Sequence, residues 1–273
     1  MPFDLPPVEK NSSAYVQHIC ENENEQEMEA PPLARQLCDP ILQRRARDAD
    51  FEKDRLKIDQ DYEKMLATVR KQQGIGVASN QCTDIEDPLR MTIIGTDDED
   101  IRKAFYEALP NDELPLPFVM INPEIISWSE ETYFPQRGEG CLSLNCGVRG
   151  KVARHQSITV KFFDMDGVEH IEVFHAIPAH IIQHELDNIN EGVLFFEKIL
   201  AECSEAQKQE MIECIALFEA GQVEENEDES LKRALCFDRD ETGKVIFYPE
   251  VFKMGLLDIS HETLAGLKKS LIR

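Results

Sequence analysis

Apolar positions recur at helical spacing in the first part of the chain. Between residues 34 and 73, large apolar side chains repeat every three to four positions, and Gly74 and Gly76 follow them. This period is typical of the buried face of an amphipathic helix, and glycine is common where helices end. We therefore predict helix over 34–73, with a buried face of Phe51, Ile58, Tyr62, Met65, Leu66 and Val69.

The pattern changes to short apolar or alternating runs between residues 91 and 175. MTIIGT (91–96) and FVMINPEIISW (118–128) are typical of strands, and residues 156–174 predict a hairpin that turns at Asp166-Gly167. Pro178 then stands in the first turn of a predicted helix that runs to about Ile189, and a further helix is predicted over 196–220. The order of helix, strands, helix and helix indicates an α+β fold.

The two ends of the chain differ from its middle. Residues 1–33 carry a run of glutamates and close with Pro31-Pro32, which is typical of a disordered acidic extension. Residues 221–273 are predicted to be an acidic linker (GQVEENEDES, 221–230) and a small C-terminal extension. Part of this extension fits the first half of a calcium loop, but Pro249 stands where the closing glutamate belongs, so a β hairpin is the alternative. The residues concerned are Asp238, Asp240, Thr242 and Gly243.

The formal net charge of −24 changes the range of expected partners. Phosphate contacts need Lys and Arg, so we expect no general binding to nucleic acid or to anionic membranes. No apolar run has the length of a membrane span, and the N-terminus lacks the basic and apolar segments of a secretion signal. Eight cysteines without a CxxC pair fit reduced thiols, so a cytoplasmic protein is expected.

Candidate chemistry begins with the stretch His180-Ile-Ile-Gln-His184-Glu185-Leu-Asp-Asn188. Residues four apart on a helix share one face, so His180, His184 and Asn188 should line up beside Glu185. In the motif H-E-x-x-H, two histidines bind a metal ion and the glutamate transfers protons. Here Asn188 replaces the second histidine. A packed His-Glu pair with a structural role is the alternative reading of this stretch alone.

Two further stretches extend this pattern. They are Gly74-Ile-Gly76-Val-Ala-Ser-Asn-Gln81 and Glu139-Gly-Cys141-Leu142-Ser143. In this order and at these spacings, the three stretches resemble the peptide deformylases, whose signatures read GxGxAAxQ, EGCLS and QHExDH. The resemblance covers roughly residues 36–200, and it makes residues 34–220 the expected catalytic domain. It implies an α+β fold in which antiparallel strands pack around a central helix that carries the His-Glu motif.

The resemblance also implies a role for each matching residue. Cys141 and His184 would bind a divalent metal ion, Fe(II) or Zn(II), with position 188 as the third ligand. Glu185 would act as general base and acid, while Gln81 and the backbone N–H of Leu142 would hold the formyl oxygen. Peptide binding would involve Gly76, which would contact the peptide backbone, and Arg154, which would lie near the substrate entrance. The expected substrate is a peptide with a formylated or otherwise acylated N-terminus.

Asn188 stands where the family has a ligand histidine, and an amide oxygen is a weak ligand for Fe(II) or Zn(II). Three accounts follow. Asn188 ligates weakly and leaves a slow enzyme, His180 substitutes for the missing ligand, or the protein is a non-catalytic peptide-binding module.

Two other departures concern the substrate side-chain pocket and the C-terminal region. The family has apolar residues that line a methionine pocket at the positions of His180 and Arg137. We therefore predict a polar, basic pocket that favours an acidic side chain, unless Arg137 points to solvent. Bacterial deformylases can dock on the ribosome through a basic C-terminal helix. Residues 201–230 contain ten acidic residues and only Lys208 as a cation, so no such docking is expected.

Overall fold

The structure of the protein is a computed structural model, and it describes residues 34–37, 39–97, 99–106, 116–144, 147–192, 194–223, 234–257 and 259–272. The predicted acidic extension at 1–33 and most of the predicted linker at 221–230 lie outside these residues. All elements described below belong to the unit Pro32–Arg273.

Five antiparallel strands form the main sheet, in the order β1-β2-β3-β6-β7. The predicted strands are confirmed as β2 (Met91–Ile94) and β3 (Phe118–Trp128), and the predicted hairpin as β6 (Ser157–Phe163) and β7 (Glu169–His175). Two features were not predicted from the sequence: the edge strand β1 (Gly76–Ala78), and the small pair of β4 (Thr132–Tyr133) with β5 (Arg154–His155).

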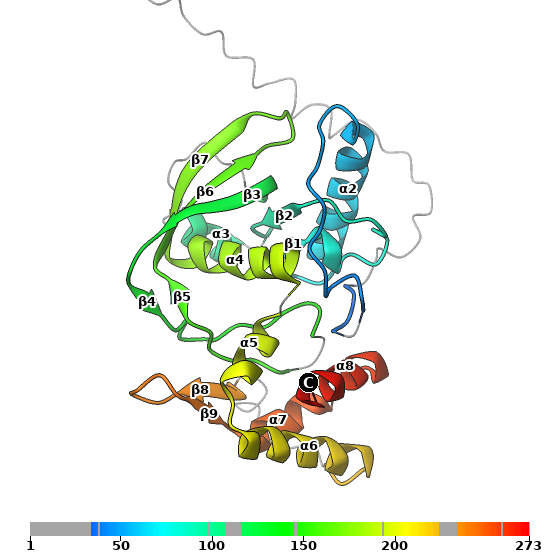
Figure 1. Ribbon diagram of the computed structural model, residues 1–273, viewed down its shortest axis with the longest axis vertical. Helices are drawn as coiled ribbons and strands as arrows, with labels where there is room; N and C mark the ends of the chain where they lie inside the picture. The colour runs from blue at the N-terminus through cyan, green and yellow to red at the C-terminus, as the bar shows by residue number, and fades with distance from the viewer. Residues whose placement is uncertain are drawn as a thin grey trace, which may run out of the picture. The chain divides into compact units, whose positions relative to one another are not determined.

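The helix that carries the His-Glu motif, α4 (Ala176–Leu186), packs against this sheet (Figure 1). Ala179, Ile182 and Leu186 share a buried cluster with Phe162 of β6 and Phe174 of β7. A π-helical turn over Asp187–Glu191 follows directly. The predicted α+β class, with antiparallel strands around a central helix, is therefore confirmed.

Helix α2 (Arg55–Lys71) packs its apolar face against β1, β2 and β3. The prediction of helix over 34–54 was wrong, because side chains there bond to the backbone and compete with a helix. Asp39 accepts from the N–H of Ile41, and Asp50 accepts from the N–H groups of Glu52 and Lys53. A short helix, α3 (Glu99–Tyr106), lies between β2 and β3, in a region that was expected to be mostly strand.

The C-terminal elements gather around a second core at the lower end of Figure 1. The helix predicted over 196–220 is two helices, because Ser204 caps a new one by accepting from the N–H of Gln207. The calcium-loop segment is a β hairpin whose turn is closed by Asp240. The elements are α5 (Phe195–Glu202), α6 (Glu205–Glu219), β8 (Phe237–Arg239), β9 (Val245–Phe247), α7 (Pro249–Leu256) and α8 (His261–Ile272).

Among the residues that the structure describes, none of the helices combines the length and apolar character needed to cross a bilayer.

Candidate functional site

The three motif stretches meet at one cavity of about 780 Å³. The edge strand β1 and the 3-10 turn after it supply Gly76 and Gln81, and α4 supplies His184 and Glu185. The third wall is the segment Gly138–Leu142. Segments far apart in the sequence are thus brought together because α4 packs beneath β1 and β2.

Glu139 is the centre of a buried polar network beside this cavity. Its carboxylate accepts two bonds from Arg154, at 2.6 Å from Nε and 2.7 Å from Nη2. It also lies 2.7 Å from Nδ1 of His184 and 3.1 Å from Nε2 of His180. Arg154 reaches Asp187 as well, at 2.6 Å. Glu139 therefore fixes the ring orientation of His184 through Nδ1, which leaves Nε2 of that ring on the side away from Glu139.

Electrostatics set the charge state of this network. Burial opposes the charge of Glu139, but the Arg154 guanidinium outweighs burial and holds the pKa of that carboxyl well below its usual range. Burial also opposes a charged His184, but hydrogen bonds to Cys141 and Glu139 outweigh it and raise the pKa of His184. Cys141 and His184 both line the cavity, as a shared ligand site requires.

Glu185 lies on the same helix but in a different environment. Its side chain is buried, and burial raises its pKa to about 7. A Cβ added at Gly76 would lie 2.7 Å from Oε1 of Glu185, so a larger residue at this point of the edge strand would displace that carboxylate. A carboxyl group with a pKa near 7 can both accept and donate a proton at neutral pH.

Gln81 is held in a fixed orientation by its own backbone turn. Its Oε1 accepts from the N–H of Ala78 at 2.8 Å, so its Nε2 is directed toward the Glu139–Ser143 segment. There Nε2 lies 3.3 Å from Sγ of Cys141 and 3.1 Å from Oγ of Ser143. Within the described residues, the N–H of Leu142 donates to no protein acceptor. Both donors can therefore bind an oxygen that enters the cavity.

Asn188 lies in the π-helical turn, one turn after His184, and is almost fully buried. Its Nδ2 lies 3.4 Å from Glu185, whereas its Oδ1 has no hydrogen-bond partner among the described residues. A buried oxygen without a partner is costly, and it fits a site that binds a cation. Because Asn188 is an amide, the described part of the chain gathers no trio of His, Cys, Asp or Glu around a metal position.

The residues predicted to bind substrate lie in different places. His180 lines the cavity, as expected, although its Nε2 is engaged by Glu139. Arg137 is exposed and does not line the cavity, which corresponds to the alternative that it points to solvent. The prediction that Arg154 lies near the entrance was wrong: it is 3% exposed, because it is buried between Glu139 and Asp187.

Two residues near the cavity were not predicted from the sequence. Arg149 lines the cavity, and Asp187 pairs with Arg154 and Lys198. The motif pattern did not indicate Arg149, because Arg149 lies after the Glu139–Ser143 stretch, where the sequence cannot be aligned residue by residue with the family signatures.

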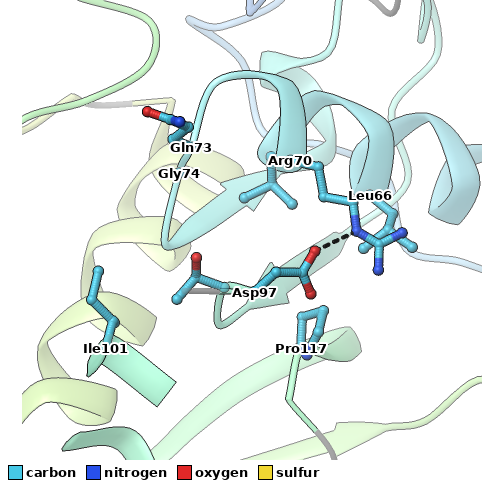
Figure 2. Close-up of a pocket in the computed structure, with 9 residues that line it drawn as sticks. Leu66, Arg70, Gln73, Gly74, Asp97, Ile101 and Pro117 are labelled. Atoms are coloured by element: carbon cyan, nitrogen blue, oxygen red, sulfur yellow. Dashed lines mark hydrogen bonds and ion pairs between the residues drawn. The ribbon is translucent and has the colours of Figure 1, made fainter. Parts of the chain in front are cut away.

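A smaller pocket of about 430 Å³ adjoins the cavity, and the two share Gln73 and Gly74. Figure 2 shows Arg70 paired with Asp97 in this pocket, at 2.7 Å. Its lining includes Leu66, Ile101 and Pro117 but none of the residues of the catalytic motifs beyond Gly74.

Comparisons with known proteins identify the family to which this chain belongs. A family model described as polypeptide deformylase matches residues 34–205. The peptide deformylase of Christiangramia forsetii is 35% identical over 165 residues, which are 59% of this chain and 78% of the relative. That of Ligilactobacillus salivarius is 34% identical over 127 residues, which are 46% of this chain and 61% of the relative.

Two solved structures are similar to more than half of the chain. A class I type b peptide deformylase from Acinetobacter baumannii is 28% identical with a TM-score of 0.50, covering 62% of this chain and 99% of that chain. A probable peptide deformylase from Synechococcus phage S-SSM7 is 26% identical with a TM-score of 0.50, covering 61% of this chain and 98% of that chain. The family model ends at residue 205, so nearly all of α6 and everything after it lies beyond the match.

Proposed function

Because the chain belongs to the polypeptide deformylase family, we propose that it hydrolyses the bond between a formyl group, or a related acyl group, and the N-terminal amine of a peptide. The observation that carries this proposal is the meeting of Gln81, Cys141, His184 and Glu185, from three distant segments, at one cavity.

Glu185 is the proton-transfer group of the proposed reaction. With a pKa of about 7, its carboxylate takes a proton from the attacking water and, once protonated, gives it to the leaving amine. Gly76 leaves room for this exchange, because any larger residue there would collide with Oε1 of Glu185.

Gln81 and Leu142 stabilise the negative charge that develops on the formyl oxygen. Both residues line the cavity, and the Nε2 of Gln81 lies 3.3 Å from Sγ of Cys141. Each such donor contributes about 3 kcal/mol to the stability of the transition state in comparable sites. The Ala78 N–H that holds Gln81 keeps this donor oriented before the substrate arrives.

The donor set fits a divalent ion, Fe(II) or Zn(II), with two strong ligands and one weak ligand. Cys141 Sγ and His184 Nε2 would hold it, with the unpartnered Oδ1 of Asn188 as the third protein ligand. Such an ion, when bound, lowers the pKa of water and polarises the formyl carbonyl.

The activity is tested by measuring formate release from a formyl-methionyl tripeptide. We expect release by the wild type, and a loss of at least a hundredfold in Glu185→Gln, because the proton-transfer group is removed. Glu213→Gln, at an exposed position on α6, is the matched control and should retain wild-type turnover. Equal rates in all three proteins would contradict the role of Glu185.

A non-catalytic peptide-binding protein is the second candidate, and Asn188 in place of the ligand histidine is the observation that favours it. Asn188→His separates the two candidates when metal content and turnover are measured together. Metal and turnover in the wild type support the enzyme. A wild type that binds formyl peptides without hydrolysing them, and gains both metal and turnover in Asn188→His, supports the binding protein.

Ribosome docking through α6 is not part of the proposed function, because this helix exposes four glutamates, has Lys208 as its one cation, and would therefore repel RNA phosphates. Co-sedimentation of the protein with ribosomes at moderate salt would contradict this.

A further inference from the structure

Arg149 is an unusual cation in the wall of the cavity. Its partly buried guanidinium makes only long contacts, at 3.4 Å to the carbonyl of Arg137 and 3.3 Å to that of Gly138. Within the described residues it forms no ion pair with a carboxylate. The more deeply buried arginines differ, since Arg35 pairs with Asp39, Arg90 with Asp48, and Arg154 with Glu139 and Asp187.

An unpaired and partly buried cation is energetically costly unless a ligand compensates it. Burial lowers the pKa of Arg149, which reflects this cost. The two acids of the cavity do not compensate it by contact: Glu139 is engaged by Arg154 and His184, and Glu185 faces Gly76 and Asn188. The cavity therefore presents a cation that is available to an incoming anion.

The C-terminal hairpin holds the backbone of Arg149 in place. The N–H groups of Cys236 and Phe237 both donate to the carbonyl of Arg149, at 2.9 and 3.2 Å. The N–H of Lys151 donates to the carbonyl of Phe237 at 3.1 Å, and its Nζ pairs with Asp238 at 2.6 Å. Residues 236–238 thus form hydrogen bonds and an ion pair with the residues on both sides of Gly150, Arg149 and Lys151.

Gly150, the residue after Arg149, is hydrogen-bonded to the backbone of Glu139, which belongs to the candidate site. Gly150 exchanges two backbone hydrogen bonds with Glu139, at 2.7 and 3.1 Å. A Cβ at Gly150 would lie 2.9 Å from Cβ of Phe237, so glycine allows the hairpin to approach this closely. Farther along, the N–H of Gly147 donates to the carbonyl of Gly255 in α7 at 3.2 Å. Arg149 is therefore fixed between Glu139 and elements that lie beyond the family match.

We propose that Arg149, held in the cavity wall by the C-terminal hairpin, binds a carboxylate group of the peptide. This inference rests on the proposed function, because it assigns a ligand chemistry to the same cavity. The carboxylate belongs either to an acidic side chain at the N-terminal residue or to the free C-terminus of a short peptide. Both sources present the same planar anion, which a guanidinium binds through two parallel hydrogen bonds.

The test measures binding of deformylated peptides by calorimetry, so it does not depend on turnover. Three probes separate the sources: Met-Ala amide carries no carboxylate, Met-Ala carries a C-terminal one, and Glu-Ala amide carries a side-chain one. We expect at least one carboxylate probe to bind at least tenfold more tightly than the neutral amide, and Arg149→Gln to remove this preference. Arg149→Lys, which keeps the charge, should retain part of it.

Arg137→Gln is the matched control, because Arg137 is an exposed arginine near the same loop. It should keep the wild-type preference within about twofold, as expected for a solvated charge. The inference is overturned if the wild type binds all three probes equally, or if Arg149→Gln and Arg137→Gln behave alike. If the wild-type protein releases no formate but still binds a carboxylate probe more tightly than the neutral amide, the proposed function is contradicted and this binding site is supported.

The holding role of the C-terminal elements has a separate test in Gly255→Val. A Cβ at Gly255 would lie 3.2 Å from the carbonyl carbon of Gly147 and 3.3 Å from the nitrogen of Val148, so a larger side chain must push this segment away. We expect weaker binding of the carboxylate probe, by threefold or more, with unchanged binding of the neutral amide. A variant with lowered thermal stability and wild-type preference would contradict the holding role.

Discussion

Replacement of Glu139 by Gln perturbs the buried network that supports the site. The carboxylate is 3% exposed and faces an equally buried Arg154. Removing one partner of a buried ion pair costs about 3–5 kcal/mol, because the other charge is left uncompensated. Arg154 keeps Asp187 at 2.6 Å, and the amide of Gln keeps one acceptor oxygen, so the lower end of the range applies. We expect a loss of about 3 kcal/mol in the free energy of unfolding.

Thermal unfolding followed by circular dichroism measures this effect. At about 2–4 °C per kcal/mol for a chain of this size, Tm should fall by about 6–12 °C. Glu124→Gln is the control, because Glu124 pairs with Lys161 at 3.1 Å but its side chain is 58% exposed. Such surface pairs contribute about 1 kcal/mol or less, so Tm should change by only a few degrees.

The same substitution should weaken metal binding, because Glu139 orients the ring of His184. Loss of such a partner typically lowers metal affinity by about 10–100-fold. If Glu139→Gln and Glu124→Gln have the same Tm and the same metal affinity, then the network around Glu139 neither stabilises the fold nor supports the site.

Four further predictions follow from single contacts. Asn188→His should raise metal affinity at least tenfold in competition with a chelator, since an imidazole replaces a weak amide ligand, and unchanged affinity would exclude position 188 as a ligand. Gly150→Ala should lower the free energy of unfolding by about 1–3 kcal/mol in urea, because its Cβ would collide with Ile199, and a neutral effect would contradict the close packing of the hairpin. Arg47 holds the pKa of Asp54 far below its usual range, so this pair stabilises the fold fully above about pH 4, the ordinary range of an Asp carboxyl, and its effect decreases progressively as pH falls toward the lowered pKa. Asp54→Asn should therefore lower Tm more at pH 7 than near pH 2. In native, metal-free protein at pH 8, iodoacetamide should modify Cys141 faster than the cysteines whose pKa burial raises to about 11 or 12, as peptide mass spectrometry would show; these are Cys82, Cys203, Cys214 and Cys236.

Local patterns predicted the elements that are strongly periodic. The alternating run of β6 and β7 and the turn at Gly167, which has a φ of +77°, were recognisable because both signals are local. The edge strand β1 was missed because it has only three residues, too few to show a period, and exists through its pairing with β2. Residues 34–54 had helical spacing, but contacts such as that of Ala49 with the side chain of Asn122 hold them in an irregular path.

For the candidate site too, residues in local motifs were predicted, whereas residues placed by tertiary contacts were not. Cys141, His184, Glu185 and Gln81 were predicted because each belongs to a motif with fixed internal spacing. Arg149 was not, because its place in the cavity depends on a hairpin about 90 residues later in the chain. Arg154 was assigned to the entrance from sequence register alone, whereas its charge is used internally by Glu139 and Asp187. Whether an arginine faces a cavity depends on which carboxylates the fold places beside it, and the sequence alone does not show this.

The central claim is that Cys141 and His184, with Asn188, hold one divalent ion in the cavity. Titration of metal-free protein with Co(II) in the absence of oxygen, followed by absorption, tests it most directly, because a thiolate ligand gives a sulfur-to-cobalt charge-transfer band. We predict that one equivalent of Co(II) produces this band, that Cys141→Ser abolishes it, and that Cys214→Ser, in the C-terminal core, retains it. Absence of the band in the wild type, or its persistence in Cys141→Ser, would contradict the claim.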